Sequence, residues 1–132
     1  MDRDTLIFLS FDDVIHLHHK EIERFGGATG IRDTHLLSSA IAQADLHLFG
    51  NPVYSHLYEI AAVYAFHIIK NHPFVDGNKR TGILAAMTFL AINNTSIPII
   101  QKELLYTLAI QIADGTLTKE AAIDFFKTHL GA

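Results

Sequence analysis

Apolar residues recur every three or four positions along most of this chain, which is the spacing of helices that bury one face. The first such stretch follows Ser10, which together with Asp13 has the pattern of a capping box. The pattern predicts a first helix that starts at Ser10, stops at Gly26-Gly27 and carries four apolar residues at helical spacing, Val14, Leu17, Ile22 and Phe25.

A second helix is predicted after Asp33, a favoured N-cap residue. Its apolar positions are Leu36, Leu37, Ala40, Ile41 and Ala44. The segment "LFGNPVYS" then breaks the pattern. A third helix, over about residues 55–71, is apolar on nearly all sides from Ile60 to Ile69. A helix of this kind is buried, so we expect it at the centre of the fold.

Three further helices complete the expected fold. One begins near Asn78 and carries Ile83, Leu84, Met87, Leu90 and Ala91; the others cover about residues 101–113 and 118–130, the last capped by Thr118. The β-branched segments "TLIFL" (5–9) and "SIPII" (96–100) could pair as a small ribbon. We therefore expect an all-α protein, a compact bundle of about six helices with room for a two-stranded β element.

Length and composition fit a single folded domain over residues 1–132. With 49% hydrophobic and 18% charged residues, the chain has enough apolar surface for a core. It contains no cysteine, so neither a disulfide nor a cysteine-based zinc site can form. The net charge of -4 argues against direct DNA binding, for which a basic stripe would be expected.

The start of the chain and its most apolar stretches bear on location. The opening "MDRDTLIFLS" lacks the cationic start and long apolar run of a signal peptide. The stretches "IAAVYAFHII" and "ILAAMTFLAI" each have about ten residues, against roughly 20 for a bilayer span. We expect a cytoplasmic protein with no membrane partner.

The segment "HPFVDGNKR", residues 72–80, gathers groups suited to phosphate chemistry. Asp76-Gly77 is a turn signal and Asn78 a preferred N-cap, so a helix start with unpaired N–H donors is predicted there. Such a helix start binds anions. Lys79 and Arg80 in its first turn would add a mobile cation and a planar fork for phosphate oxygens.

The remaining residues of this segment complete a plausible active site. Asp76 lies where a carboxylate and phosphates could share Mg²⁺. His72 can take a proton from a hydroxyl nucleophile, a role worth about 10² to 10⁴ in rate. Pro73 is expected to stop the preceding helix and force His72 toward an extended conformation, while Phe74 anchors the loop in the core.

The segment "HPFVDGNKR" resembles the HxFx(D/E)(G/A)NxR signature of the Fic/Doc superfamily, whose members move a phosphate-containing group from a nucleotide to a protein hydroxyl. The upstream "LHHKEIERFGGATGIRDTHLLSSAI" is similar to the N-terminal part of death-on-curing (Doc) toxins, so the resemblance covers about residues 10–130. It implies a Fic/Doc-like helical fold and a toxin of a type II toxin–antitoxin system.

The resemblance also implies a role for each matching position. His72 would be the general base and Asp76 would bind Mg²⁺, with ATP as the phosphate donor. The anion hole and the phosphate-holding positions would be Gly77, Asn78, Lys79 and Arg80. These roles agree with those argued from charge and position alone.

Two positions favour phosphate over AMP as the transferred group. The adenylyl-transferring branch of the superfamily typically reads HPFxxGNGRxxR, whereas this chain has Lys79 and Ile83 at the last glycine and the second arginine. Doc toxins share both features and are understood as kinases that pass the γ-phosphate to a threonine of elongation factor Tu and arrest translation. Pro73 and Gly77 are more Fic-like, which keeps adenylyl transfer as the alternative.

The resemblance implies regulation by a second protein. Self-inhibiting Fic proteins carry an (S/T)xxxE(G/N) helix, and the nearest segments here, Thr116–Ala121 and Ser55–Ile60, fail at the final position. An antitoxin whose disordered tail folds as a helix into a groove is then expected. The positive mean hydropathy of +0.23 is consistent with apolar surface left over for such a groove.

Other interpretations of the same residues remain open. His16 and His19 with His67, His72 and Asp76 would suit a metal hydrolase, although His16, His18 and His19 fit a helix surface with one of them packed. A catalytically inactive antitoxin-binding module is the other alternative. Four residues could face the site or serve as caps and surface groups: Arg32, Asp33, Glu59 and Asn71.

Overall fold

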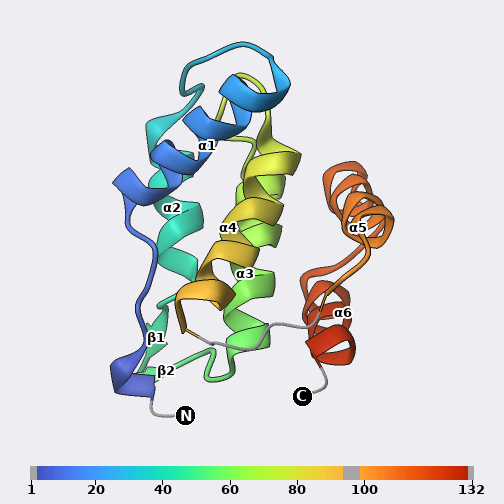
Figure 1. Ribbon diagram of the computed structural model, residues 1–132. Helices are drawn as coiled ribbons and strands as arrows, with labels where there is room; N and C mark the ends of the chain where they lie inside the picture. Colours follow the sequence, from blue (N-terminus) through green and yellow to red (C-terminus); the bar gives the residue numbers. More distant parts are fainter. Residues whose placement is uncertain (1–2, 94–98, 131–132) are drawn as a thin grey trace.

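The protein is a bundle of α-helices in the computed structural model, which describes residues 3–93 and 99–130 (Figure 1). A short 3-10 helix, η1 (Arg3–Thr5), precedes the bundle. The α-helices of the described residues are α1 (Phe11–Phe25), α2 (Thr34–Gln43), α3 (Leu57–Asn71), α4 (Asn78–Asn93), α5 (Lys102–Asp114) and α6 (Lys119–Leu130). The all-α prediction of about six helices is therefore confirmed.

The central helix is α3, as its apolar composition predicts. Its residues Ile60 to Ala65, together with Ile68 and Ile69, are buried. The closest packing is against α4, where Gly82 lies so near to Ile69 that an added Cβ would stand 2.6 Å from Ile69 Cγ1. Small residues on α4, Ala85 and Ala86, continue this contact and are fully buried. The α3–α4 pair thus forms the rigid centre of the molecule.

The other helices cover this pair from two sides (Figure 1). On one side α1 packs on α4 and α2 packs on α3. On the other side α6 packs on α3, and α5 contacts both α3 and α4. None of the helices in residues 3–93 and 99–130 is long and apolar enough to span a bilayer.

The predicted helix starts agree with the structure where the cap is local. Ser10 accepts the Asp13 N–H at 3.1 Å while Asp13 accepts the Ser10 N–H at 2.8 Å, which completes the capping box. Asp33 caps α2 through the Leu36 N–H at 3.0 Å, and Thr118 caps α6 through the Ala121 N–H at 3.1 Å. These caps satisfy N–H groups that have no carbonyl partner within the helix.

The β element forms at an unexpected place. Strands β1 (His47–Leu48) and β2 (Asn51–Pro52) pair as an antiparallel hairpin that begins one residue before "LFGNPVYS", with His47 opposite Pro52. The predicted ribbon cannot be compared in full, because residues 94–98, which hold most of "SIPII", lie outside the described residues. Among the described residues, the backbone of Ile7 is instead bonded to the Asn93 side chain at the end of α4, by two hydrogen bonds of 2.7 Å.

The apolar face predicted for α4 is partly wrong. Leu90 is buried, but Ile83, Leu84 and Met87 are only half-buried, and Ala91 is exposed. The core face of α4 instead consists of small residues with two large ones, namely Thr81, Gly82, Ala85, Ala86, Phe89 and Leu90. Helical spacing alone cannot tell a face that meets the core from one that lines a groove.

Candidate active site at the start of α4

The segment from His72 to Arg80 connects α3 to α4 and continues into the first turn of α4. His72 ends α3 in the left-handed region, with φ 51° and ψ 54°. The expectation of an extended His72 was wrong. Arg32 explains the difference, since its guanidinium donates to the carbonyl oxygens of His72 at 2.7 Å and of Asn71 at 3.0 Å. These bonds hold the last carbonyls of α3 and turn the backbone at His72 sharply.

Phe74 fixes the loop in the core, as predicted. Its side chain is fully buried, and its backbone forms an isolated antiparallel bridge with Ile31. The His18 ring of α1 stacks on the Phe74 ring with centroids 3.8 Å apart and planes 3° apart. The Nε2–H of His18 also donates to the Asp76 carbonyl oxygen at 2.8 Å. Residues from α1 therefore position both Phe74 and Asp76.

The Asn78 side chain binds the loop and not an open anion site. It is buried, with its Oδ1 accepting the Phe74 N–H at 2.9 Å and its Nδ2 donating to the Phe74 carbonyl oxygen at 3.0 Å. Asn78 is thus the first residue of α4 rather than its N-cap, and the first helical bond runs from Thr81 N–H to the Gly77 carbonyl oxygen at 2.9 Å. The N-cap prediction was wrong because the Asn78 amide is already bonded to the backbone of Phe74 and so does not cap the helix.

The same amide also determines which nitrogen of His72 is protonated. Nδ2 of Asn78 lies 3.1 Å from Nδ1 of His72. Because Oδ1 already accepts from Phe74, the atom facing His72 is the amide nitrogen, which only donates. Nδ1 of His72 is therefore the acceptor, and the neutral ring carries its proton on Nε2. The nitrogen that can take up a further proton is thus Nδ1, and it can do so only if the ring gives up its contact with Asn78.

Asp76 is an ionised carboxylate held between two backbone donors. Its Oδ2 accepts the Ala28 N–H at 3.1 Å, and its Oδ1 accepts the Gly77 N–H at 2.8 Å. The bond from Ala28 has the larger effect and the bond from Gly77 the next. Both hold the pKa of Asp76 below its ordinary value because they stabilise the charged form. The loop after α1 approaches so closely that a Cβ on Gly27 would lie 2.6 Å from Asp76 Oδ2, which requires glycine there.

Asp76 fits the requirements of a magnesium ligand. Mg²⁺ in proteins commonly takes one or two carboxylates and completes its shell with phosphate and water oxygens. Asp76 is exposed at the pocket mouth, and each of its oxygens keeps a lone pair beyond the bond it accepts. In residues 3–93 and 99–130 no group of three histidine, aspartate or glutamate side chains gathers as a metal site would.

The two cations of the motif point to different surroundings. Arg80 donates to the Gly26 carbonyl oxygen at 3.2 Å, and its guanidinium lies 5.7 Å from the centre of the Phe25 ring. Lys79 is exposed, and within the described residues no hydrogen bond or ion pair engages its ammonium group. The N–H groups of Asn78, Lys79 and Arg80 precede the first helical bond, so the start of α4 offers donors and positive charge together.

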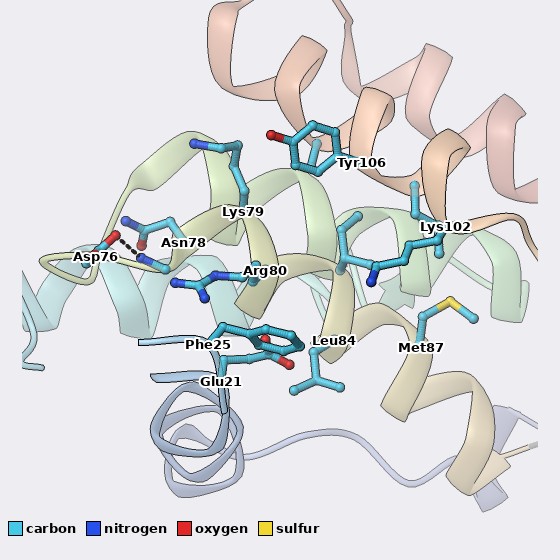
Figure 2. Close-up of a pocket in the computed structure, with 14 residues that line it drawn as sticks. Glu21, Phe25, Asp76, Asn78, Lys79, Arg80, Leu84, Met87, Lys102 and Tyr106 are labelled. Atoms are coloured by element: carbon cyan, nitrogen blue, oxygen red, sulfur yellow. Dashed lines mark hydrogen bonds between the residues drawn. The ribbon is translucent and has the colours of Figure 1, made fainter. Parts of the chain in front are cut away.

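These residues open into a groove of about 560 Å³ between α1, α4 and α5 (Figure 2). One end carries Asp76, Gly77, Asn78, Lys79 and Arg80. The groove then follows α4 past Ile83, Leu84 and Met87, where α5 contributes its opposite wall. His72 is exposed beside the groove but does not line it. The polar end and the apolar length of the groove together could hold a ligand with both characters.

The structure shows the contacts of the four residues whose roles the sequence did not decide, Arg32, Asp33, Glu59 and Asn71. Asp33 and Glu59 are caps: Glu59 Oε1 accepts the N–H groups of Ser55 and His56 before α3. Asn71 donates to the Leu36 carbonyl oxygen at 2.9 Å and so fastens α2 to α3. Arg32 acts on the site indirectly through the His72 backbone.

The histidines separate as the sequence suggested, with one packed. His16 and His19 are exposed on α1, whereas His18 is buried. The importance of His18 for the loop was missed, although a signal was present: it lies one turn from both Val14 and Ile22, on the buried face of α1. A histidine within an apolar stripe needs a polar partner, and here that partner is the motif itself.

Comparison with known proteins agrees with this geometry. The Fic/DOC family matches residues 8–90, which include α1, the whole motif and most of α4. The chain belongs to the Fic/DOC family.

Two curated relatives are similar to this Fic/DOC chain. A protein named Toxin Doc from Mycolicibacterium smegmatis (strain ATCC 700084 / mc(2)155) is 41% identical over 73 residues, which is 55% of this chain and 56% of the relative. The match thus spans little more than half the length of that relative. A protein named Protein kinase doc from Escherichia phage P1 is 26% identical over 124 residues, covering 94% of this chain and 96% of the relative.

Proposed function

We propose that this Fic/DOC protein is a Doc-like toxin that transfers the γ-phosphate of ATP to a hydroxyl of a translation factor such as elongation factor Tu, and so arrests translation. The observation that carries the proposal is the arrangement at the start of α4: Lys79, Arg80 and unpaired N–H donors face one end of a groove, with Asp76 at its mouth and His72 beside it. The printed names of the two relatives, a toxin and a protein kinase, support it.

Each group has a defined part in the transfer. The hydroxyl oxygen of the target attacks the γ-phosphorus, the bond from that phosphorus to the oxygen bridging to the β-phosphate breaks, and ADP leaves. His72 takes the hydroxyl proton. Because the unprotonated nitrogen of the resting ring is Nδ1, the contact with Asn78 opens in this step. Lys79 and Arg80 hold the phosphates in line.

A metal ion would complete the phosphate site. Bound Mg²⁺ would offset the negative charge of the phosphates, and Asp76 is the residue that would hold it. The lowered pKa of Asp76 keeps the carboxylate ionised at neutral pH, as a magnesium ligand must be.

Phosphate transfer is favoured over adenylyl transfer by two side chains on the groove. Lys79 occupies space that a glycine would leave open, and Ile83 places an aliphatic group where the adenylyl-transferring proteins have a second arginine. Without that arginine, the α-phosphate lacks one of its usual hydrogen-bond donors. The groove continues as an apolar surface past Ile83, which suits a nucleotide whose γ-phosphate lies at the α4 start.

An antitoxin is the proposed regulator. The length of the groove that follows α4 is lined by apolar side chains, and Tyr106, 65% exposed, extends this surface along α5. A disordered tail that folds as a helix into such a groove would cover the phosphate site and inhibit transfer.

Mass spectrometry of the modified target tests the reaction. The protein is incubated with elongation factor Tu, ATP and Mg²⁺, and the intact target is weighed. A gain the size of one phosphate is expected, whereas a gain the size of AMP would overturn kinase activity in favour of adenylyl transfer. The His72→Ala variant serves as the matched control and should leave the target unmodified.

Bacterial growth tests whether toxicity depends on catalysis. Expression of the wild-type protein should arrest growth, and the His72→Ala variant should not, because its ring can no longer accept the hydroxyl proton. Arrest by both proteins at equal expression would contradict catalysis and favour an inactive binding module.

A further inference from the structure

Glu21 of α1 is a mostly buried residue whose carboxylate the proposed chemistry does not use. Only 7% of the residue is exposed. Among the described residues, no hydrogen bond or ion pair engages it, although its neighbours on the same helix, His18 and Phe25, contact the motif loop and Arg80. Its oxygens are not among the buried side-chain atoms that lack a partner in the described residues, so the small exposed part of Glu21 includes the carboxylate, at the wall of the groove.

The nearest cation of the motif does not neutralise it. Arg80 lines the same groove, but its guanidinium donates to the Gly26 carbonyl oxygen and lies over the Phe25 ring. Glu21 itself lines the groove, so its oxygens face the space that a ligand would enter. The carboxylate is therefore available to accept hydrogen bonds from outside the chain.

The position of Glu21 along the groove indicates which part of a ligand could donate hydrogen bonds to its carboxylate (Figure 2). Figure 2 shows Glu21 below Arg80 and beside Leu84, between the end with Asp76 and the end with Met87 and Lys102. An α-helix rises about 1.5 Å per residue, so the stretch from Gly77, just before α4, to Met87 extends for roughly 15 Å. That length accommodates an extended nucleoside triphosphate.

A nucleotide whose terminal phosphate lies at Lys79 and Arg80 would place its sugar midway along this groove. The far end has the apolar side chains of Met87, Leu105 and Ala109 beside the cation Lys102, and its apolar part suits the flat face of a base. Between the two ends, Glu21 is the acidic group on the α1 wall. A carboxylate has two oxygens that can accept from two neighbouring hydroxyls, which is how acidic residues bind ribose in other nucleotide sites.

We propose that Glu21 binds the 2′- and 3′-hydroxyls of the ribose and thereby selects ribonucleotides over deoxyribonucleotides. This inference rests on the proposed nucleotide-dependent transfer and names the part of the nucleotide that the groove recognises. The hydroxyl protons satisfy the carboxylate when the nucleotide is bound, and a 2′-deoxy sugar leaves one oxygen without its donor.

Nucleotide competition provides the test. Binding of ATP, 2′-deoxy-ATP and 3′-deoxy-ATP with Mg²⁺ is measured by calorimetry, and KM is measured for each in the transfer assay. The wild-type protein should prefer ATP to either deoxynucleotide by roughly tenfold, the size expected for a hydrogen bond to a charged group. Glu21→Gln should reduce this preference, and Glu21→Leu should abolish it by weakening ATP alone.

A neighbouring residue supplies the matched control. Glu23 lies on the same helix with its side chain 67% exposed, where it pairs with His19. Glu23→Gln should leave both the affinity for ATP and the preference unchanged. Glu21→Leu should also unfold at the same or a higher denaturant concentration, since it replaces a carboxylate that has no partner among the described residues with an apolar side chain beside Leu84.

Several outcomes would overturn the inference. These are equal affinity of the wild-type protein for ATP and 2′-deoxy-ATP, an unchanged preference in Glu21→Leu, or a loss of stability in that variant without an effect on nucleotide binding. Weaker antitoxin binding in Glu21→Gln with unaltered ATP affinity would assign Glu21 to a cationic side chain of the partner instead. If no nucleotide bound at all, the proposed transfer itself would fail, and the ribose contact with it.

Discussion

At the scale of single residues, the candidate base is held by groups that are distant in sequence. His72 has a positive φ of 51°, a conformation that costs a non-glycine residue of order 1–3 kcal/mol. Arg32 lies 40 residues earlier in the sequence. Its two charge-assisted hydrogen bonds to the end of α3 offset this cost. The left-handed turn and the direction of the imidazole thus depend on one exposed arginine.

Removal of that arginine should affect turnover more than nucleotide binding. In Arg32→Ala, the carbonyls of Asn71 and His72 lose their donor, so we expect kcat to fall by roughly tenfold or more as the ring leaves its position. The KM for ATP should change little, because Arg32 is not among the residues that line the groove. Steady-state kinetics of the transfer separates the two effects.

A conservative variant and a control complete this test. Arg32→Lys should recover part of the rate, since an ammonium group can reach one carbonyl but cannot donate as a fork to both. Lys20→Ala, at an exposed position of α1, should behave as the wild type. A rise in KM with unaltered kcat in Arg32→Ala would contradict a positioning role.

The contact between Asn78 and His72 makes a second prediction. Long-range ¹H–¹⁵N correlation spectra of the wild-type protein should show an unprotonated Nδ1 at His72, because the Asn78 amide donates to it. In Asn78→Asp, a carboxylate oxygen would face the same nitrogen, and the proton should move to Nδ1. A wild-type spectrum with the proton already on Nδ1 would contradict the assigned hydrogen bond.

These residues also indicate what the sequence can predict. The caps at Ser10, Asp33 and Thr118 were predictable because donor and acceptor lie three residues apart. The conformation of His72 was not, because Arg32 and Pro73 meet only in the folded chain, where the Arg32 N–H donates to the Pro73 carbonyl oxygen at 2.7 Å. The residues of the motif lie together at the start of α4, but several of their hydrogen-bond partners, such as Arg32 and Ala28, come from elsewhere in the chain.

At the scale of elements, the site depends on how closely α4 approaches α3. The first turn of α4 carries Lys79 and Arg80, and Gly82 lies one turn later at the helix contact. A Cβ at this position would meet Ile69 Cγ1 at 2.6 Å and the Ala65 carbonyl oxygen at 3.1 Å. The backbone of α3 cannot yield as a flexible side chain could, so the helices would have to separate.

We therefore expect Gly82→Ala to destabilise the protein despite the higher helix propensity of alanine. The overpacking should cost about 1–3 kcal/mol, more than the gain in propensity of at most about 1 kcal/mol. Urea unfolding followed by circular dichroism measures the change. Ser39→Ala, at an exposed position of α2, should show no such loss. Equal stability of Gly82→Ala and the wild type would mean that the two helices can move apart freely.

The helices themselves were predictable, but their faces were predictable only in part. The nearly continuous apolar composition of α3 indicated its central position correctly. In α4 the large apolar residues Ile83, Leu84 and Met87 line the groove, while the smaller Ala85 and Ala86 face the core. The close α3–α4 contact requires this arrangement, and the contact distance is a property of the pair that neither helix reveals alone.

At the scale of the whole molecule, the groove forms because α1 and α5 contact α4 on different sides. The helix α1 packs on α4 from one side and α5 contacts it from the other, so the exposed strip of α4 between them becomes the floor. The polar end of the groove depends mainly on α1, α4 and the loop between α3 and α4, whereas its far wall depends on α5. Stability of the packing between α3 and the α5–α6 pair therefore bears on the shape of the groove.

A half-buried histidine in that packing should make the whole protein sensitive to acid. Burial, together with the smaller effect of the charge of Lys119 on α6, lowers the pKa of His67 on α3 to about 4. Its Nε2 atom is buried without a partner among the described residues. In the unfolded chain the same imidazole titrates near pH 6.5. The unfolded state thus binds a proton first as the pH falls, so stability should decrease between about pH 6.5 and pH 4.

Replacement of His67 isolates this contribution. In His67→Leu, the free energy of unfolding from urea titrations at a series of pH values should lose most of its decline between pH 6.5 and about 4. The exposed His16→Gln should retain the wild-type decline. Asp76 and Asp114 have pKa values below the ordinary aspartate value, so their protonation destabilises the fold mainly at lower pH and does not obscure this window. The same decline in His67→Leu as in the wild type would show that another group controls acid unfolding.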